Sequence, residues 1–431
     1  MEVYVGLLAL QLVGCAALIK KQRDSLALVP TTPEFARLQK SFLATMLFAS
    51  CADWIQGPYL YKLYSFIGFG KGEIGYLFLA GYCSSALFGT LVGGLADRFG
   101  RKKTCLLFCL LYSGTCMTMH SHDFNVLLAG RVMSGISTSI LFSVFEAWML
   151  HEHKRDAFPD DWLVNTLSRA TFLSSAAAVA MAAVAGAVTS YGGYTAPFDT
   201  AIVFLTLTAL IIARTWKENY GNASLTPGGN FAVGWVVMAS NPRIWLLGIV
   251  QSCFEGAMYI FVYMWTPTLE STASDEGMPH GIVFACFMVS IMIGTHIYQL
   301  ALKHKETETV LMYNAAVASL CLAAPAFTSS HTINFFAFCV FEVCVGVYHP
   351  GVGFLRAKYI PEEVRATIVN FFRVPLNGFV VLVLLYTSHL SSATMGLYCA
   401  AILAVAASVH FLLARQAGQM SPAASKIDSE V

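Results

Sequence analysis

Seven charged side chains lie inside long apolar runs of this 431-residue chain. They are Asp53, Arg131, Glu146, Arg169, Glu255, Glu342 and Arg373. A charge at the centre of a bilayer costs roughly 2.5–3.5 kcal/mol on insertion scales, so such residues normally face a cavity, a solute or a charged partner. The guanidinium of arginine offers a rigid fork of N–H donors that suits a tetrahedral oxyanion. The chemistry predicted here is the binding and movement of a small polar solute, with an anion favoured.

The expected roles of these side chains differ. Substrate contact is expected for Arg131, Arg373, Asp53, Glu255 and Glu342, and also for Tyr59 in the same part of the chain as Asp53. The three acids among them can carry protons. Burial raises the pKa of a carboxyl group and a neighbouring arginine lowers it, so the arrival of a solute can change its protonation. The alternative is static ion pairing between arginines and acids. For Tyr59 the alternative is packing or a place in the aromatic belt of the membrane. Gating or helix pairing is expected for Arg169 and Glu146.

The elements that carry these residues are membrane-spanning helices, each of which needs about 20 mostly apolar residues. The first apolar run covers 3–19. Twelve more follow at about 42–64, 74–96, 104–120, 124–148, 165–189, 196–214, 243–267, 280–302, 309–328, 333–355, 366–388 and 394–414. The predicted fold class is therefore an all-α membrane protein with two six-helix halves and one extra N-terminal transmembrane helix.

The distribution of lysine and arginine supports thirteen crossings. With alternating crossings, 21 of the 26 basic residues lie on one side, two lie on the other and three lie within the membrane. Such an excess marks the cytoplasmic side. The predicted parts are the extra helix in 1–23, the first half in 40–214, a cytoplasmic loop in 215–242, the second half in 243–415 and a cytoplasmic tail in 416–431.

The turn between the second and third core helices has a distinct pattern. Residues 93–103 read GGLADRFGRKK, and both the acid and the basic cluster must remain in water. Gly100 permits a sharp turn. Asp97 and Arg101 are expected to act in gating or in pairing of helices.

The spacing G-x-L-A-D-R-x-G-R-K of this turn resembles the signature of major facilitator superfamily transporters. In that superfamily helices 1, 4, 7 and 10 of the twelve-helix core line the central pathway, and all four intramembrane acids fall on them. The resemblance implies two halves that rock around a central site near Asp53, Glu255, Glu342, Arg131 and Arg373.

A narrower resemblance runs over nearly the whole chain. Residues 53–64 (DWIQGPYLYKLY), 145–148 (FEAW), 254–255 (FE), 265–267 (WTP) and 370–376 (NFFRVPL) are similar to segments of the molybdate-anion transporter family. This resemblance implies secondary-active uptake of molybdate, a tetrahedral dianion. Sulfate has the same shape and charge, and no residue pattern separates the two. Transport of another anionic or polar solute, or solute sensing without transport, stays open.

Other classes of function are not supported by the composition. The chain is 57% hydrophobic and 12% charged, where a soluble domain carries about 25% charged residues. A net charge of +1 gives no reason to expect a nucleic-acid partner. The pattern G-x-x-x-x-G-K-S/T does not occur, so ATP is not the direct energy source. Protons are one candidate for the coupling ion, which the sequence does not identify. We expect no enzyme activity, cofactor or metal, and we expect a multi-pass protein of the plasma membrane.

Overall fold

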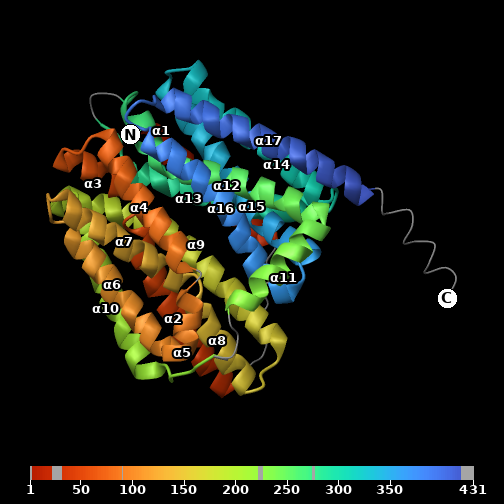
Figure 1. Cartoon of the computed structure of the whole chain (residues 1–431). Helices are drawn as coiled ribbons and strands as arrows, with labels where there is room; N and C mark the ends of the chain where they lie inside the picture. The colour runs from red at the N-terminus through yellow and green to blue at the C-terminus, as the bar shows by residue number, and fades with distance from the viewer. Residues whose placement is uncertain (1, 22–31, 90, 222–226, 274–276, 419–431) are drawn as a thin grey trace. The chain divides into compact units, whose positions relative to one another are not determined.

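The computed structural model describes residues 2–21, 32–89, 91–221, 227–273 and 277–418, and every regular element within these ranges is an α-helix (Figure 1). The all-helical class is therefore confirmed. Most of the predicted tail in 416–431 lies outside the described residues. The helices form two compact units. The N-terminal unit comprises Met1–Leu225 and Pro279–Val289, and the C-terminal unit comprises Thr226–Met278 and Ser290–Val431.

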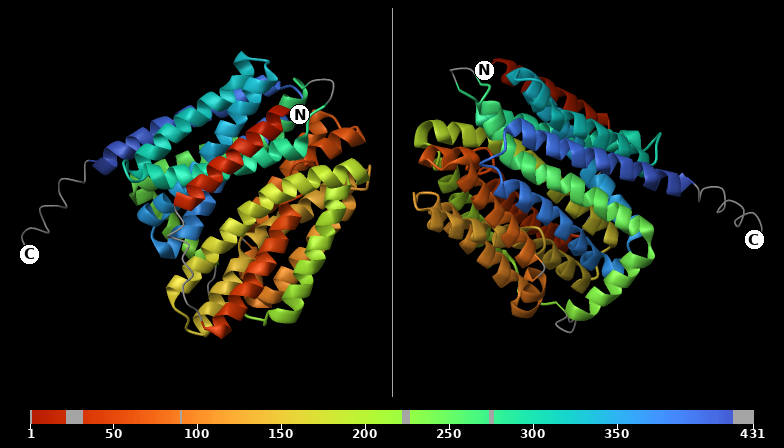
Figure 2. Two further views of the ribbon diagram at one scale, coloured as in Figure 1. Left: turned by 180° about the vertical axis from the view of Figure 1, so that it is seen from behind. Right: turned by 45° about the horizontal axis from the view of Figure 1, so that its top comes forward.

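The N-terminal unit contains α1 (Glu2–Lys21), α2 (Pro33–Trp54), α3 (Leu60–Ile67), α4 (Lys71–Gly89), α5 (Val92–Phe99), α6 (Arg101–Thr118), α7 (Phe124–Leu141), α8 (Val144–Arg155), α9 (Asp160–Gly192) and α10 (Ala196–Thr215). The C-terminal unit contains α11 (Pro227–Ser240), α12 (Pro242–Glu270), α14 (Thr307–Phe327), α15 (His331–Tyr359), α16 (Glu362–Leu385) and α17 (Ser392–Gly418). Helix α13 (His280–Ala301) contributes residues to both units. Helix α1, the red helix in Figure 2, contacts the part of α13 that belongs to the N-terminal unit, where the Cys286 thiol donates to the Tyr4 carbonyl.

Several helices begin at residues whose side chains satisfy free backbone N–H groups. The Asp123 carboxylate accepts from the N–H groups of Asn125 and Val126 at the start of α7. The Asn241 amide oxygen accepts from the Arg243 N–H at the start of α12, where Pro242 occupies the first turn. These caps stabilise the starts of α7 and α12, the helices that carry Arg131 and Glu255.

The number of spanning helices differs from the sequence expectation. Nine described helices are long and apolar enough to cross a membrane, counting α7 with α8 as one, or ten if the bent pair α4 and α5 is one span. The sequence predicts thirteen. The other three predicted spans correspond to α1, whose apolar part is short, and to α2 and α6, which carry several charges near their ends.

Three predicted runs are broken in the structure, and one of them, 74–96, divides between α4 and α5. The run 42–64 is wrong as one helix, because α2 ends at Trp54 and α3 begins at Leu60. Pro58 lacks the N–H that a continuing helix needs. The run 124–148 divides between α7 and α8. Here Ser139 and Ser143 donate to carbonyls four residues earlier, a pattern that bends helices.

A third difference lies between the two predicted halves. The segment 215–242 was expected as a loop, yet it contains α11, an uncharged helix of 14 residues. It is too short to span a bilayer by itself. Within the C-terminal unit α11 packs against α12 and α16, while α14 and α17 run side by side (Figure 1).

Candidate functional site

In the N-terminal unit, Asp53 is held by a tyrosine from another helix. The Tyr112 hydroxyl of α6 donates to Asp53 Oδ1 of α2 over 2.6 Å. The ring of the next residue, Trp54, donates to the Ser174 hydroxyl of α9 over 3.2 Å. Neighbouring residues at the end of α2 thus connect it to two helices. No cation forms an ion pair with Asp53 in the part of the chain that the structure describes.

Arg131 lies on α7 with weak contacts only. Its Nε and Nη1 atoms lie 3.4 Å from the Leu77 carbonyl and the Ser134 hydroxyl, at the long limit for a hydrogen bond. The guanidinium also lies 5.6 Å from the centre of the Phe78 ring. It is close enough to the Tyr112 hydroxyl to act on it electrostatically. Among the described residues no carboxylate pairs with Arg131.

Glycine explains how Arg131 fits between α4 and α7. A Cβ atom at Gly135 would lie 2.5 Å from the Gly81 carbonyl oxygen, so the two helices approach backbone to backbone. A Cβ atom at Gly81 would lie 2.6 Å from Arg131 Nη2. The sequence spacing Arg131-x-x-x-Gly135 therefore places a close helix contact one turn from the guanidinium.

Tyr59 and Arg169 both contact side chains of the N-terminal unit. Tyr59 is 6% exposed, and its ring lies 5.6 Å from the His280 ring and 6.1 Å from the Tyr194 ring. Arg169 of α9 donates to the Gln39 amide oxygen of α2 over 3.4 Å, and Gln39 donates in turn to Thr166 over 2.7 Å. Arg169 thus joins α2 to α9.

The turn at 93–103 is joined to two other segments. Arg101 pairs with Asp97 at 2.7 Å and donates to the Ala147 carbonyl of α8 over 3.1 Å. The Glu218 carboxylate accepts from the N–H of Lys102 at the positive end of α6. Gly100 has φ +108°, and a Cβ atom there would lie 2.6 Å from the Glu218 carboxylate. The turn therefore connects α5 and α6 to α8 and to the chain after α10.

Glu146 is not brought to the other acids. It lies on the exposed side of α8, beside the Ala147 carbonyl that Arg101 binds. No hydrogen bond or ion pair of its carboxylate occurs among the described residues. Among the described residues, the link between Glu146 and its expected role is its place next to Ala147, whose carbonyl accepts from Arg101.

In the C-terminal unit, Glu255 belongs to a polar cluster that crosses from α12 to α15. Its Oε1 atom accepts from Arg356 Nη2 over 2.8 Å and from the Tyr348 hydroxyl over 3.2 Å. Arg356 Nε donates to the Gln251 amide oxygen over 2.9 Å. The Tyr348 ring stacks on Phe254 at 4.1 Å. The ion pair that the sequence left as an alternative is present for Glu255.

Glu342 and Arg373 lie apart from that ion pair. Glu342 on α15 is 7% exposed and accepts no hydrogen bond from any described residue. Arg373 on α16 is exposed, and within the described ranges no acceptor or acid pairs with it.

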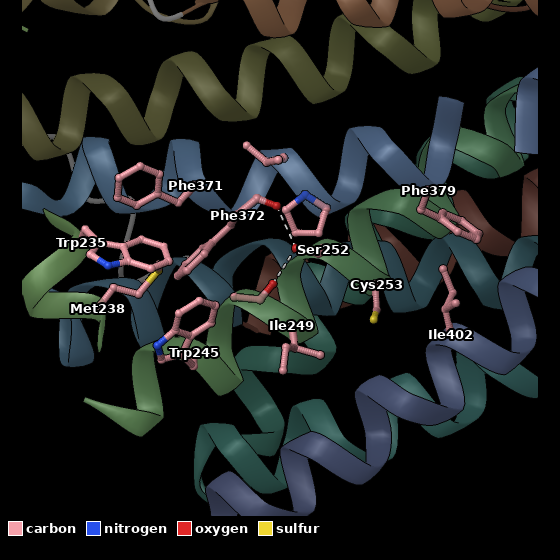
Figure 3. A pocket seen from close by; sticks show the side chains of 13 residues that line it. Trp235, Met238, Trp245, Ile249, Ser252, Cys253, Phe371, Phe372, Phe379 and Ile402 are labelled. Carbon is pink, nitrogen blue, oxygen red and sulfur yellow. Dashed lines mark hydrogen bonds between the residues drawn. The ribbon is translucent and has the colours of Figure 1, made fainter. Parts of the chain in front are cut away.

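A cavity of about 430 Å³ lies between α11, α12, α16 and α17 (Figure 3). Its lining is apolar and includes Trp235, Trp245 and Phe372. Ser252 lines it too, but its hydroxyl is taken by the carbonyls of Gly248 and Phe372. Arg373 is not part of the lining. A hydrophobic cavity without a free polar group does not suit an anion.

Sequence reasoning missed two sets of charged residues at the end of α15. It placed Arg356 among the cytoplasmic charges after the run 333–355, whereas α15 continues to Tyr359 and Arg356 reaches Glu255. It also overlooked Glu308 of α14, which is fully buried and accepts from Lys358 and Tyr359. Tyrosine and glycine residues precede Arg356 in the sequence, at the end of the apolar run. A count of apolar residues does not show whether the helix continues through such a segment.

Comparison with known sequences finds one matching family model and several relatives with the same name. A family model described as sugar transporters with 12 TM, MFS_5, matches residues 1–340. The molybdate-anion transporter of Xenopus tropicalis is 34% identical, and the match covers 92% of this chain and 89% of the relative. The molybdate-anion transporter of Danio rerio is 33% identical, and the match covers 93% of this chain and 92% of the relative.

Comparison with solved structures gives the fold. The POT family transporter PepTSo superposes with a TM-score of 0.72 at 13% identity and covers 91% of this chain and 99% of its own. A D-xylose-proton symporter superposes with a TM-score of 0.66 at 11% identity, covering 88% and 97%. At such low identity these likenesses concern the fold alone, and they agree with the major facilitator fold expected from the sequence.

Proposed function

The chain belongs to the molybdate-anion transporter family of the major facilitator superfamily, and on that premise we propose that it carries molybdate across a membrane by secondary-active alternating access. Molybdate is the solute in the names of its relatives. The proposal agrees with the names of the relatives, and it also agrees with the charged residues of this chain.

One observation carries the proposal of an anionic substrate. Arg131 and Arg373 have apolar runs on both sides, and neither has an acidic partner among the described residues. An unpaired charge in a membrane protein is costly and usually serves a solute or an ion pathway. A dianion supplies the missing negative charge, and its oxygens accept the free N–H groups. We assign Arg131 and Arg373 as anion contacts, each within its own unit.

Gly81→Ala tests the position of Arg131 without removing its charge. The new methyl group would push the guanidinium away, and misplacing a binding group by about 1 Å can cost up to about a hundredfold in rate. We expect the KM for labelled molybdate to rise while the protein folds normally, because only the end of a flexible side chain must move. Gly114→Ala on α6 is the matched control, since its Cβ would meet Met133 at an ordinary 3.5 Å. Equal KM values for the two variants would remove Arg131 from the site.

The membrane topology is part of the same proposal. We place the protein in the plasma membrane with thirteen crossings, α1 being the extra helix and the turn at 93–103 cytoplasmic. The basic residues of that turn support the orientation. The loop 215–242 is then cytoplasmic, with α11 lying at the membrane surface. The two halves are 40–214 and 243–415.

The gating residues connect helix ends on the proposed cytoplasmic side. Asp97 and Arg101 hold α5 and α6 to the α8 carbonyl at Ala147, and Arg169 joins α9 to α2 through Gln39. Contacts of this kind must break when the helix ends separate. We propose that they stabilise one state of the transport cycle, with Glu146 acting beside the Arg101 contact.

Protons are the proposed coupling ion. Glu342 is the acid best placed to carry one, because it is buried and no cation lies beside it in the described part of the chain. Asp53 is a second candidate, since its partner is the uncharged Tyr112 hydroxyl. Glu255 is less suited, because Arg356 already compensates its charge.

A second candidate substrate is an uncharged sugar, which the description of the matching family model favours. Tyrosine and glutamine side chains such as Tyr348 and Gln251 can hydrogen-bond hydroxyl groups. A sugar would nevertheless leave Arg131 and Arg373 without a counter-charge. For that reason we favour the oxyanion, and we keep a sensor without transport as the remaining alternative.

The function is tested by uptake of labelled molybdate into proteoliposomes of the purified chain. Unlabelled molybdate, sulfate or a sugar is added in parallel, with and without an imposed pH gradient. We expect saturable uptake that resists sulfate and sugar and that the gradient accelerates. Folded protein that takes up none of the label would refute the proposal, and competition by a sugar alone would favour the second candidate.

A further inference from the structure

We propose that Arg356 is a further anion-contacting residue, and that Gln251 and Glu255 are the residues that position its guanidinium for a tetrahedral oxyanion. This inference rests on the proposed function and deepens it. Arg356 was not among the residues that the sequence suggested. All of these residues lie on α12 and α15, both within the C-terminal unit.

The geometry fixes one edge of the Arg356 guanidinium. Nε donates to Gln251 over 2.9 Å and Nη2 donates to Glu255 over 2.8 Å. Gln251 and Glu255 are four residues apart on α12, so their side chains lie on one face of the helix. A planar guanidinium that donates from two N–H groups on one edge is held in a single orientation.

The other edge of the guanidinium stays available. No acceptor for Nη1 occurs among the residues that the structure describes. The Arg356 side chain is 26% exposed, so this edge is within reach of a solute. An arginine that is oriented on one edge and open on the other matches an oxyanion, which accepts two parallel N–H donors.

The negative charge of Glu255 suits a residue that orients Arg356, and it does not suit a residue that binds the anion. Glu255 is negative, so it orients Arg356 but weakens its attraction for a dianion. The Tyr348 hydroxyl on the same oxygen and the nearby His349 add no fixed negative charge. Replacing Glu255 by Gln keeps an oxygen acceptor for Arg356 and removes the repulsion. Affinity for the anion is therefore expected to rise in that variant.

The experiment compares variants for uptake of labelled molybdate by the full chain in proteoliposomes. Arg356→Lys keeps the charge but loses the planar fork, so KM should rise by about tenfold, the value of one charge-assisted hydrogen bond. Glu255→Gln should lower KM severalfold. The double variant Arg356→Gln with Glu255→Gln leaves no unpaired buried charge and should fold, yet its KM should rise as much as that of Arg356→Lys or more.

The matched control removes a neighbouring ion pair that plays no part in the site. Lys358 lies two residues beyond Arg356 on a different face of α15, where it pairs with Glu308. Lys358→Gln with Glu308→Gln should leave KM unchanged. Saturable uptake by the wild type with an unchanged KM in Arg356→Lys, or a raised KM in Glu255→Gln, would overturn this inference and leave the function standing. Absence of uptake in the folded wild type would refute the function itself.

Discussion

Replacing Arg373 by Gln is expected to reduce saturable uptake of molybdate by roughly tenfold to a hundredfold, because a hydrogen bond to a charged group contributes about 1.5–3 kcal/mol. Arg373 lies exposed on α16 without an acidic partner in the described ranges. Its removal therefore leaves no buried acid uncompensated. We expect normal expression and thermal stability alongside the loss of uptake.

The control for Arg373 lies on the same helix. Arg365 donates from Nε and Nη2 to the Ile360 carbonyl, a contact near the start of α16 that involves no solute. Arg365→Gln should leave the KM for molybdate unchanged. The decisive measurement is initial-rate uptake at several concentrations, normalised to the amount of folded protein. Wild-type uptake by Arg373→Gln would show that this arginine does not contact the anion.

Replacing Lys358 alone by Gln is expected to destabilise the C-terminal unit strongly. Glu308 is 1% exposed at its side chain, and Lys358 is the cation on its Oε1 atom at 2.8 Å. Breaking a buried pair from one side costs about 3–5 kcal/mol, and we expect about 2–4 kcal/mol here, since Lys358 is 37% exposed. The buried Oε2 atom of Glu308 has no partner among the described residues, which leaves the carboxylate dependent on Lys358 and Tyr359.

Thermal unfolding in detergent measures this effect. The single variant Lys358→Gln should unfold at a lower temperature than the wild type, and adding Glu308→Gln should restore most of the loss, because no buried charge then remains unpaired. The order of the three melting temperatures is the test. A double variant no more stable than the single variant would mean that Lys358 acts through its own packing and not through Glu308.

The positions of charges along the sequence predicted some contacts and not others. Asp97 and Arg101 are four residues apart, so a local ion pair between them follows from helix geometry, and it is present. In the same turn, Arg101 contacts Ala147 and Lys102 contacts Glu218, and these pairs are 46 and 116 positions apart in the chain. No spacing in the sequence encodes such contacts. The same holds for Tyr112 with Asp53.

By itself, the sequence determined the membrane class, the all-helical content and the family, and it showed which charges lie inside apolar runs, because apolar length and misplaced charge are local properties. Only the tertiary structure decided which charges are compensated. Glu255 has Arg356 as its partner, Glu308 has Lys358, and Arg131 and Arg373 have no acid beside them in the described chain. The tertiary structure also decided where the first core helix breaks and that α11 forms in the predicted loop. The physical reason is that compensation of a charge depends on distance in space, and residues a hundred positions apart become neighbours only when the helices pack.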